Sequence, residues 1–265
     1  MVLGSLAVGY LAVRLLDVIP NPYWWPILAL SVWIIYSFDH LLDGYKHKNN
    51  GKIERHNYYF RNRKIIIPIM GLFSLIVVIL SFLYLDKGII TGGILLGIIT
   101  LLYFLTINFS SVNIRYFIPK ELIISIIYTT GIVMAPIIWK GELPEPSVIL
   151  IIIIIGLLAF SEGVMISYFD YELDLADGHS SFTIRFGQTQ TKRFLLALHL
   201  IVEIAIIIAL FKAETRFILI CLILLLLINF ILGLLTMIPH RPFVLKYHKI
   251  IGEAVFILPF ILTLF

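Results

Sequence analysis

Four residues that could do chemistry lie where a long apolar run gives way to polar sequence: Asp39, His40, Asp43 and His47. A helix turns by about 100° per residue, so the four side chains would share one face. Carboxylates spaced i and i+4 repel each other, and more so at the edge of an apolar layer, so we expect this pair to bind a cation. The histidines leave two interpretations open. They could ligate a metal, which would shift the preference toward Mn²⁺, Fe²⁺ or Zn²⁺, or they could form ordinary hydrogen bonds.

A second acidic group, Asp170, Asp174 and Asp177, follows another apolar run. If the helix continues that far, these carboxylates also share one face. Carboxylate oxygens suit Mg²⁺, which keeps several waters and bridges a few carboxylates to substrate phosphates. Basic residues predicted on the same side could bind a polyanion directly: Arg55, Lys120 and Arg185. Together the groups predict a diphosphate site beside an apolar cavity, suited to a charged head with an isoprenoid tail.

The composition indicates which elements carry these groups. Of the 265 residues, 60% are hydrophobic and only 14% are charged, whereas ordinary soluble domains have about a quarter charged residues. The apolar runs are long and do not alternate with polar residues, which favours membrane-spanning helices over a barrel. A net charge of +4 spread over short loops does not suggest nucleic-acid binding. The single Cys221 excludes an internal disulfide and a cysteine-based metal site.

Nine apolar runs are long enough to cross a membrane, which takes roughly 20 residues. They lie near residues 2–19, 24–44, 65–85, 88–108, 120–139, 147–170, 194–211, 217–238 and 249–265. We therefore predict one all-α domain over 1–265, a polytopic bundle of about nine transmembrane helices around a central cavity. The first run has no basic start and leads directly into the second, so we expect a span rather than a cleaved signal peptide.

Lys and Arg are concentrated in the even-numbered loops, above all in segment 45–64. The positive-inside rule places these loops, and both acidic groups, in the cytoplasm of a multi-pass protein of the cytoplasmic membrane. The N-terminus is then inside and the C-terminus outside. Four runs separate the two acidic groups, so both emerge on the same side whichever side that is. Within 45–64, Tyr58, Tyr59 and Phe60 stand among basic residues, as in a segment resting on lipid headgroups.

The second acidic group resembles a motif of the UbiA superfamily of intramembrane prenyltransferases. The family pattern is D-x-x-x-D-x-x-x-G-x-x-T-L-A-V-R-L-G. The matching residues here are Asp170, Asp174, Gly178 and the run Ser181-Phe182-Thr183-Ile184-Arg185-Phe186-Gly187. The spacing is the same throughout, and Ser181 stands in the place of the threonine.

The first acidic group departs from the corresponding family pattern, N-D-x-x-D-x-x-x-D. Its matching residues are Asp39, His40, Asp43 and His47, of which only Asp43 is the expected type. The family commonly has an arginine shortly beyond this motif, and Arg55 stands in that region. The two histidines reduce the negative charge of the group, which implies a changed metal, a single metal or a lost activity.

The resemblance implies nine helices, both motifs on the cytoplasmic side, and a mechanism. Two Mg²⁺ ions would bind the diphosphate of a polyprenyl diphosphate and stabilise its departure. The residues expected to hold the metal and act in catalysis are Asp39, Asp43, Asp170 and Asp174. Those expected to contact the substrates are His40, His47, Arg55, Lys120, Glu162, Asp177 and Arg185. An allylic carbocation would form in a cavity shielded from water and react with a hydrophobic or amphipathic acceptor, such as a quinone-type ring or another lipid.

Other functions stay open at this point. A terpene cyclase on the same scaffold would capture the carbocation internally, without an acceptor. A silent relative that binds or transports a lipid is motivated by His40 and His47, although acids at one boundary rather than at mid-membrane argue against transport. Glu162 lies about 12 Å deeper than Asp170 by helical rise. It could bind the acceptor or take its proton, or it could be a protonated acid bonded to a neighbouring helix.

Overall fold

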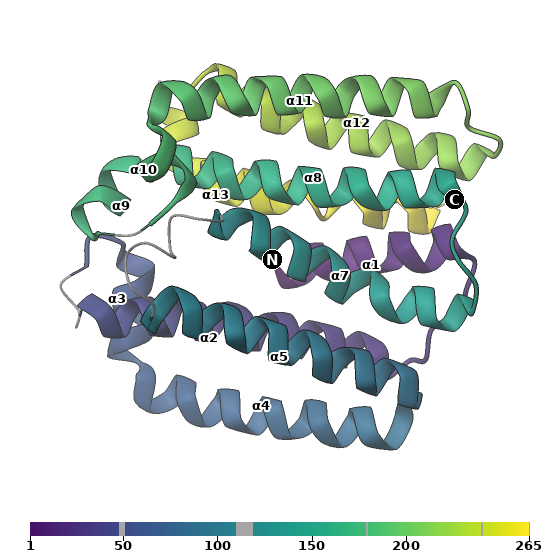
Figure 1. Cartoon of the computed structure of the whole chain (residues 1–265), viewed down its shortest axis with the longest axis horizontal. Coiled ribbons are helices and arrows are strands. Elements are labelled where there is room, and N and C mark those ends of the chain that lie inside the picture. The colour runs from purple at the N-terminus through teal and green to yellow at the C-terminus, as the bar shows by residue number, and fades with distance from the viewer. Residues whose placement is uncertain (48–50, 110–118, 179, 240, 265) are drawn as a thin grey trace.

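The computed structural model describes residues 1–47, 51–109, 119–178, 180–239 and 241–264, and helices dominate these ranges (Figure 1). The long helices are α1 (Val2–Leu16), α2 (Trp24–His47), α4 (Arg63–Tyr84), α5 (Lys87–Phe109), α7 (Lys120–Lys140), α8 (Pro146–Phe169), α11 (Gln188–Leu210), α12 (Arg216–Met237) and α13 (Pro242–Val255). The short elements are α3 (Glu54–Arg61), α9 (Tyr171–Ala176), α10 (Phe182–Phe186) and the 3₁₀ helix η1 (Leu258–Leu264).

Seven helices within the described ranges are long and apolar enough to cross a membrane: α2, α4, α5, α7, α8, α11 and α12. Helix α1 is apolar but has 15 residues, and the last predicted run is divided between α13 and η1. The predicted all-α, polytopic bundle is therefore confirmed. Seven of the nine predicted runs meet the length and hydropathy of a span.

Two helices begin earlier than hydropathy alone predicts. Helix α11 starts at Gln188 rather than near residue 194, because its first turns are polar and carry no hydropathy signal. Helix α13 starts at Pro242 rather than near residue 249. Proline in the first turn has no N–H that the helix needs, so it begins a helix as readily as it ends one.

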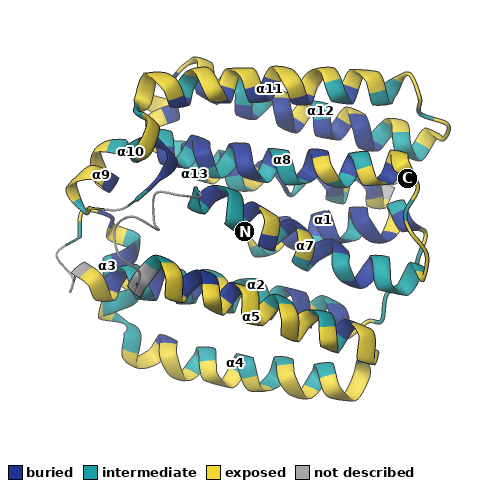
Figure 2. Ribbon diagram, in the orientation of Figure 1, coloured by how far each residue is buried: buried dark blue, intermediate teal, exposed yellow. Residues whose placement is uncertain are grey.

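Helix α8 forms the centre of the bundle, where it packs against α7, α11, α12 and α13. Its residues Ile154, Leu158 and Val164 have no exposed surface. Helices α4 and α11 lie at opposite edges (Figure 1), and their outer faces are largely exposed (Figure 2). Along α4 only Ile66 is buried. An apolar, exposed perimeter around a packed centre is the pattern expected of helices surrounded by lipid.

The short helices α3, α9 and α10 gather at one end of the bundle (Figure 1). They follow the second and sixth predicted runs, so the two acidic groups lie at the same end, as predicted. Helix α3 crosses α2 at Gly44, where a Cβ atom would lie 2.5 Å from the carbonyl oxygen of His56. Only glycine allows this close approach. The contact lets α3, which carries Arg55 and His56, pack against α2 at the end of the bundle.

Candidate functional site

A cavity of about 690 Å³ lies inside the bundle, and members of both acidic groups line it. Asp39 and Asp43 come from α2, and Asp170 and Asp174 come from the junction of α8 with α9. The volume lies within the range of about 300–1,000 Å³ usual for small-molecule sites. The structure thus brings together the four aspartates that the sequence predicted at one site.

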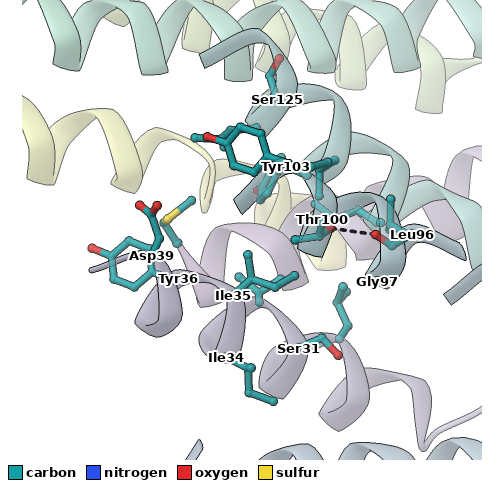
Figure 3. Close-up of a pocket in the computed structure, with 18 of the residues that line it drawn as sticks. Ser31, Ile34, Ile35, Tyr36, Asp39, Leu96, Gly97, Thr100, Tyr103 and Ser125 are labelled. Carbon is teal, nitrogen blue, oxygen red and sulfur yellow. Dashed lines mark hydrogen bonds between the residues drawn. The ribbon is translucent and has the colours of Figure 1, made fainter. Parts of the chain in front are cut away.

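The rest of the cavity wall is mainly apolar. Figure 3 shows side chains of α2 and α5 on either side of the pocket, with Asp39 and Tyr36 toward one end. Ile35 of α2 and Leu96 of α5 lie farther along the wall, beside Gly97. The site therefore has a charged end and a long apolar part.

The backbone turns at the second acidic group. Helix α8 ends at Phe169, and Asp170 (φ −86°, ψ 6°) separates it from α9. The Asp174 N–H still donates to the Asp170 carbonyl oxygen at 2.8 Å, so the two carboxyls stay one turn apart. Gly178 ends α9 with φ +63°, a left-handed conformation that glycine adopts without strain.

Asp177 is not among the cavity-lining residues. Its carboxylate accepts hydrogen bonds from the backbone N–H of Lys52, at 2.8 and 2.9 Å, and from that of Ile53, at 3.3 Å. Asp177 was predicted to contact substrate, but in the structure it joins the end of α9 to the segment that leads into α3. It thereby fixes the two acidic groups relative to each other.

Basic groups surround the second pair of carboxylates. The Lys249 Nζ lies 2.7 Å from Asp170 Oδ2, and the His248 Nε2 lies 3.8 Å from Asp170 Oδ1. Burial acts to raise the pKa of Asp170, but the neighbouring His248 imidazole and the charge of Lys249 outweigh it and hold the pKa below its usual range. At Asp174, burial raises the pKa although the Lys120 ammonium acts in the opposite direction. The two neighbouring carboxylates therefore differ in their affinity for protons.

In the first group, Asp43 Oδ1 pairs with Lys46 Nζ at 2.9 Å, and Asp43 Oδ2 lies 3.9 Å from His56 Nε2. Burial lowers the pKa of His56 to about 4, so this imidazole is neutral at pH 7. His40 is buried beside the ring of Tyr36, and neither of its nitrogens has a hydrogen-bond partner among the described residues. The side chain of His47 lies outside the described residues.

Two of the three predicted basic residues line the cavity. Lys120, at the start of α7, stands within the electrostatic range of both acidic groups. Arg55 donates a hydrogen bond to the Tyr36 hydroxyl, and its Nη1 lies 3.7 Å from Glu253 Oε1. Arg185 is exposed on α10, with its guanidinium 4.8 Å from the ring centre of Phe186, and is not among the cavity-lining residues.

The residues around Ser181 hold α10 against the bundle. The Phe182 N–H donates to Glu121 Oε1 at 3.0 Å. The Ser167 hydroxyl lies 3.0 Å from both the Oγ1 and the N–H of Thr183, donating to the first and accepting from the second. The second motif therefore combines cavity-lining acids with a segment that anchors them to α7 and α8.

Among the acidic, basic and histidine side chains of the cavity wall, four were not predicted as site residues: His56, Glu121, Lys249 and Glu253. Glu162, which the sequence did predict, lines the cavity as well. A signal existed for Glu121, because an acid next to Lys120 at the start of an apolar run is unusual. A signal also existed for Lys249, because His248 and Lys249 end a basic loop on the side of both acidic groups. No local pattern identifies His56.

The donor chemistry at the charged end fits Mg²⁺. Within the described ranges, no three His, Cys, Asp or Glu side chains lie close enough to hold one ion. Mg²⁺ does not require such a cage, because it is usually bound by one or two carboxylates with phosphate and water oxygens completing the shell. The pairs Asp39/Asp43 and Asp170/Asp174 line the cavity and supply carboxylates of this kind.

No family model and no curated protein matches this sequence. Solved structures of a UbiA homologue from Archaeoglobus fulgidus do match over nearly the full length. The structure bound to GPP and Mg²⁺ has a TM-score of 0.60 at 17% identity and covers 99% of this chain and 95% of that chain. The structure bound to DMAPP and Mg²⁺ has a TM-score of 0.60 at 18% identity, and the match covers 98% of this chain and 93% of that chain. A further structure of the A. fulgidus homologue has a TM-score of 0.63 at 14% identity, and the match covers 99% of this chain and 94% of that chain. This chain therefore has the fold of the UbiA homologue.

Proposed function

We propose that this protein is a prenyltransferase that works within the membrane. It moves an isoprenyl group from a polyprenyl diphosphate to a hydrophobic or amphipathic acceptor. The observation that carries the proposal is the meeting of Asp39, Asp43, Asp170 and Asp174 with Lys120 at one end of a mainly apolar cavity. The fold adds support, since the A. fulgidus homologue was bound to GPP or DMAPP together with Mg²⁺.

The charged end is suited to the diphosphate. The four aspartates would hold Mg²⁺, which when bound supplies positive charge to a departing diphosphate. Lys120 and Arg55, both in the cavity wall, would donate charge-assisted hydrogen bonds to the phosphate oxygens. These contacts strengthen as negative charge accumulates on the leaving group, so they favour ionisation over simple binding.

The apolar part is suited to the isoprenyl chain. Side chains of α2, α4 and α5 line this part and exclude water, which protects an allylic cation until the acceptor reacts. Tyr36 and Tyr103 lie in the wall of the pocket (Figure 3), where aromatic rings attract a cation.

Diphosphate release tests the proposal. Purified protein in detergent is incubated with geranylgeranyl diphosphate and Mg²⁺, with and without a panel of acceptors. We expect metal-dependent release that Asp174→Asn lowers by about 100-fold or more, because a buried carboxylate beside Lys120 is lost. The matched control is Glu172→Gln, which changes an exposed acid on the same helix α9 that is not part of the cavity wall.

The products separate the alternatives. An acceptor-dependent prenylated product supports the transferase. Acceptor-free release with a cyclic hydrocarbon product identifies a cyclase instead. The proposal is wrong if no release occurs with Mg²⁺, Mn²⁺ or Fe²⁺ across several tail lengths, and the chain is then a silent lipid-binding relative.

A further inference from the structure

The corner between α3 and α4, residues 58–65, carries three basic side chains within four positions: Arg61, Arg63 and Lys64. Arg61 and Lys64 are exposed. None of the three forms an ion pair with an acid in the part of the chain that the structure describes. Like charges this close to one another are mutually repulsive, so the α3–α4 corner favours an anionic partner.

The apolar surface of α4 begins directly beside this charge. Ile65 and Ile67 follow Lys64 and have exposed fractions of 63% and 46%. Figure 2 shows that the outer face of α4 is exposed along the whole helix. Such a face on a helix long enough to cross a membrane lies against lipid chains. The basic side chains just before it therefore lie at the depth of the lipid headgroups.

The two faces of α3 have different surroundings. On the inner face, the His56 carbonyl oxygen lies close to Gly44 of α2, and Arg55 donates a hydrogen bond to the Tyr36 hydroxyl. On the outer face, Tyr58 is 56% exposed, and an exposed tyrosine suits the boundary between lipid and water. A partner on the outer face would therefore contact the same short helix that places Arg55 and His56 in the cavity wall.

The joint between α3 and α4 is short and bonded. Asn62 is both the last cap of α3 and the first cap of α4, and its Nδ2 donates to the Tyr58 carbonyl oxygen at 2.9 Å. Arg63 Nη1 donates to the Phe60 carbonyl oxygen at 2.8 Å, and its guanidinium lies 4.2 Å from the centre of the Phe60 ring. A ligand held at the start of α4 would therefore restrain α3 as well.

The opposite end of α4 lacks the positive charge. The turn from α4 to α5 carries Asp86 and Lys87, whose charges cancel. The lipid-facing helix is therefore strongly positive at one end only. A phosphate ion from solution would match this charge alone, whereas an anionic phospholipid matches the charge and the neighbouring apolar surface together.

We infer that the α3–α4 corner binds the headgroup of an anionic phospholipid. Phosphate oxygens of the headgroup accept hydrogen bonds from Arg61 and Lys64, and the acyl chains lie along the exposed face of α4 that begins at Ile65. The bound lipid restrains α3 through the bonded joint. This site is separate from the cavity and does not depend on the transferase proposed above.

Lipid binding to the full chain in detergent tests the inference. Phosphatidylglycerol and phosphatidylcholine with the same acyl chains are titrated separately, and bound lipid is counted by native mass spectrometry. We expect the wild type to bind the first phosphatidylglycerol about tenfold more tightly than phosphatidylcholine, and a higher salt concentration to reduce this preference. The double variant Arg61→Gln, Lys64→Gln should reduce it to about twofold.

Two further double variants locate the effect. Arg61→Lys with Lys64→Arg keeps both charges and should keep the preference. Lys87→Gln with Lys212→Gln removes two exposed charges at the other end of the bundle (Figure 1) and should also bind as the wild type does. Equal affinity of the wild type for the two lipids, or an equal loss of preference in the variants of the two ends, would overturn the inference.

Inorganic phosphate separates a lipid site from a simple anion site. At constant ionic strength, an excess of phosphate over phosphatidylglycerol should not displace the lipid, because phosphate gains nothing from the apolar face. Displacement would show that the corner binds any phosphate and would overturn the choice of a lipid.

Hydrogen exchange tests the restraint of α3. We expect the backbone amides of Glu54–Arg61 to exchange about threefold more slowly in vesicles containing phosphatidylglycerol than in vesicles of phosphatidylcholine alone. The double variant Arg61→Gln, Lys64→Gln should show no such difference. Equal exchange of the wild type in both vesicles would contradict the restraint of α3 by the lipid.

Discussion

The two acidic groups lie at the same end of one cavity but are held in different ways. In the second group, Asp170 pairs with Lys249 of α13, and the nearby Thr183 is bonded to Ser167 of α8. In the first group, His40 is buried without a hydrogen-bond partner among the described residues. The second group is therefore fixed by contacts to other helices, whereas the first contains a buried polar side chain that those residues do not satisfy.

This difference suggests that the two groups contribute differently to ligand binding. Residues fixed by several helices keep their geometry before a ligand arrives, which lowers the cost of binding it. A buried imidazole without a partner costs free energy in the empty protein. The second group is therefore preorganised for a ligand. Substitutions in the first group should change the affinity for a metal or substrate more easily.

The largest effect should come from the contact that holds the first group in place. Gly44→Ala would put a Cβ atom 2.5 Å from the His56 carbonyl oxygen, and backbone cannot move away as easily as a side chain. We expect a loss of stability of about 3 kcal/mol, or a displaced α3, measured by thermal unfolding in detergent. Diphosphate release should fall as well, because Arg55 and His56 move with α3.

Gly71→Ala is the matched control, since nothing lies within 4 Å of a Cβ atom at Gly71 in α4. It should leave stability unchanged or raise it slightly. Equal melting temperatures for the two variants would show that the crossing of α2 and α3 does not depend on Gly44.

A smaller effect is expected from the link between the groups. Asp177→Ala removes the carboxylate that accepts the N–H groups of Lys52 and Ile53. Loss of charge-assisted hydrogen bonds at this partly exposed place should cost about 1–2 kcal/mol. Faster proteolysis near residues 51–53 should accompany the lower melting temperature. Glu172→Ala removes an exposed acid from the same helix, and an equal loss in that variant would contradict a specific link.

The smallest effect concerns the metal requirement. His40→Asp introduces the acid that the UbiA pattern has at this position and adds a carboxylate to the first group, so the Mg²⁺ concentration for half-maximal diphosphate release should fall by about threefold. His40→Asn is similar in size but uncharged and should not lower it. If the wild type, His40→Asp and His40→Asn all require the same Mg²⁺ concentration, residue 40 does not affect binding of the ion.

Much of the fold follows from the sequence because hydropathy is a local property. The run near 120–139 corresponds to α7, Lys120–Lys140, and that near 217–238 to α12, Arg216–Met237. The second acidic group was harder to predict, because the chain turns at Asp170. Asp174 lines the cavity, whereas Asp177, just after the end of α9, accepts hydrogen bonds from the backbone of Lys52 and Ile53.

The partners of the aspartates could not be predicted from local pattern. Lys249 reaches Asp170 because α13 starts at Pro242 and packs against α8. Glu121 binds the Phe182 N–H across 61 residues of sequence. Such pairings depend on which helices become neighbours, and periodicity within one helix carries no information about that.

Helix α4, which packs mainly against α2 and α3, forms part of the apolar wall of the cavity. Ser74, Val77 and Ser81 line the cavity, while Leu72 and Leu75 are exposed on the outer face. Because α4 carries none of the cavity acids, changes on its inner face alter the space for a chain without disturbing the charged end. For the transferase proposed above, chain-length preference and bond-making chemistry would then be separable traits that can evolve, or be engineered, independently.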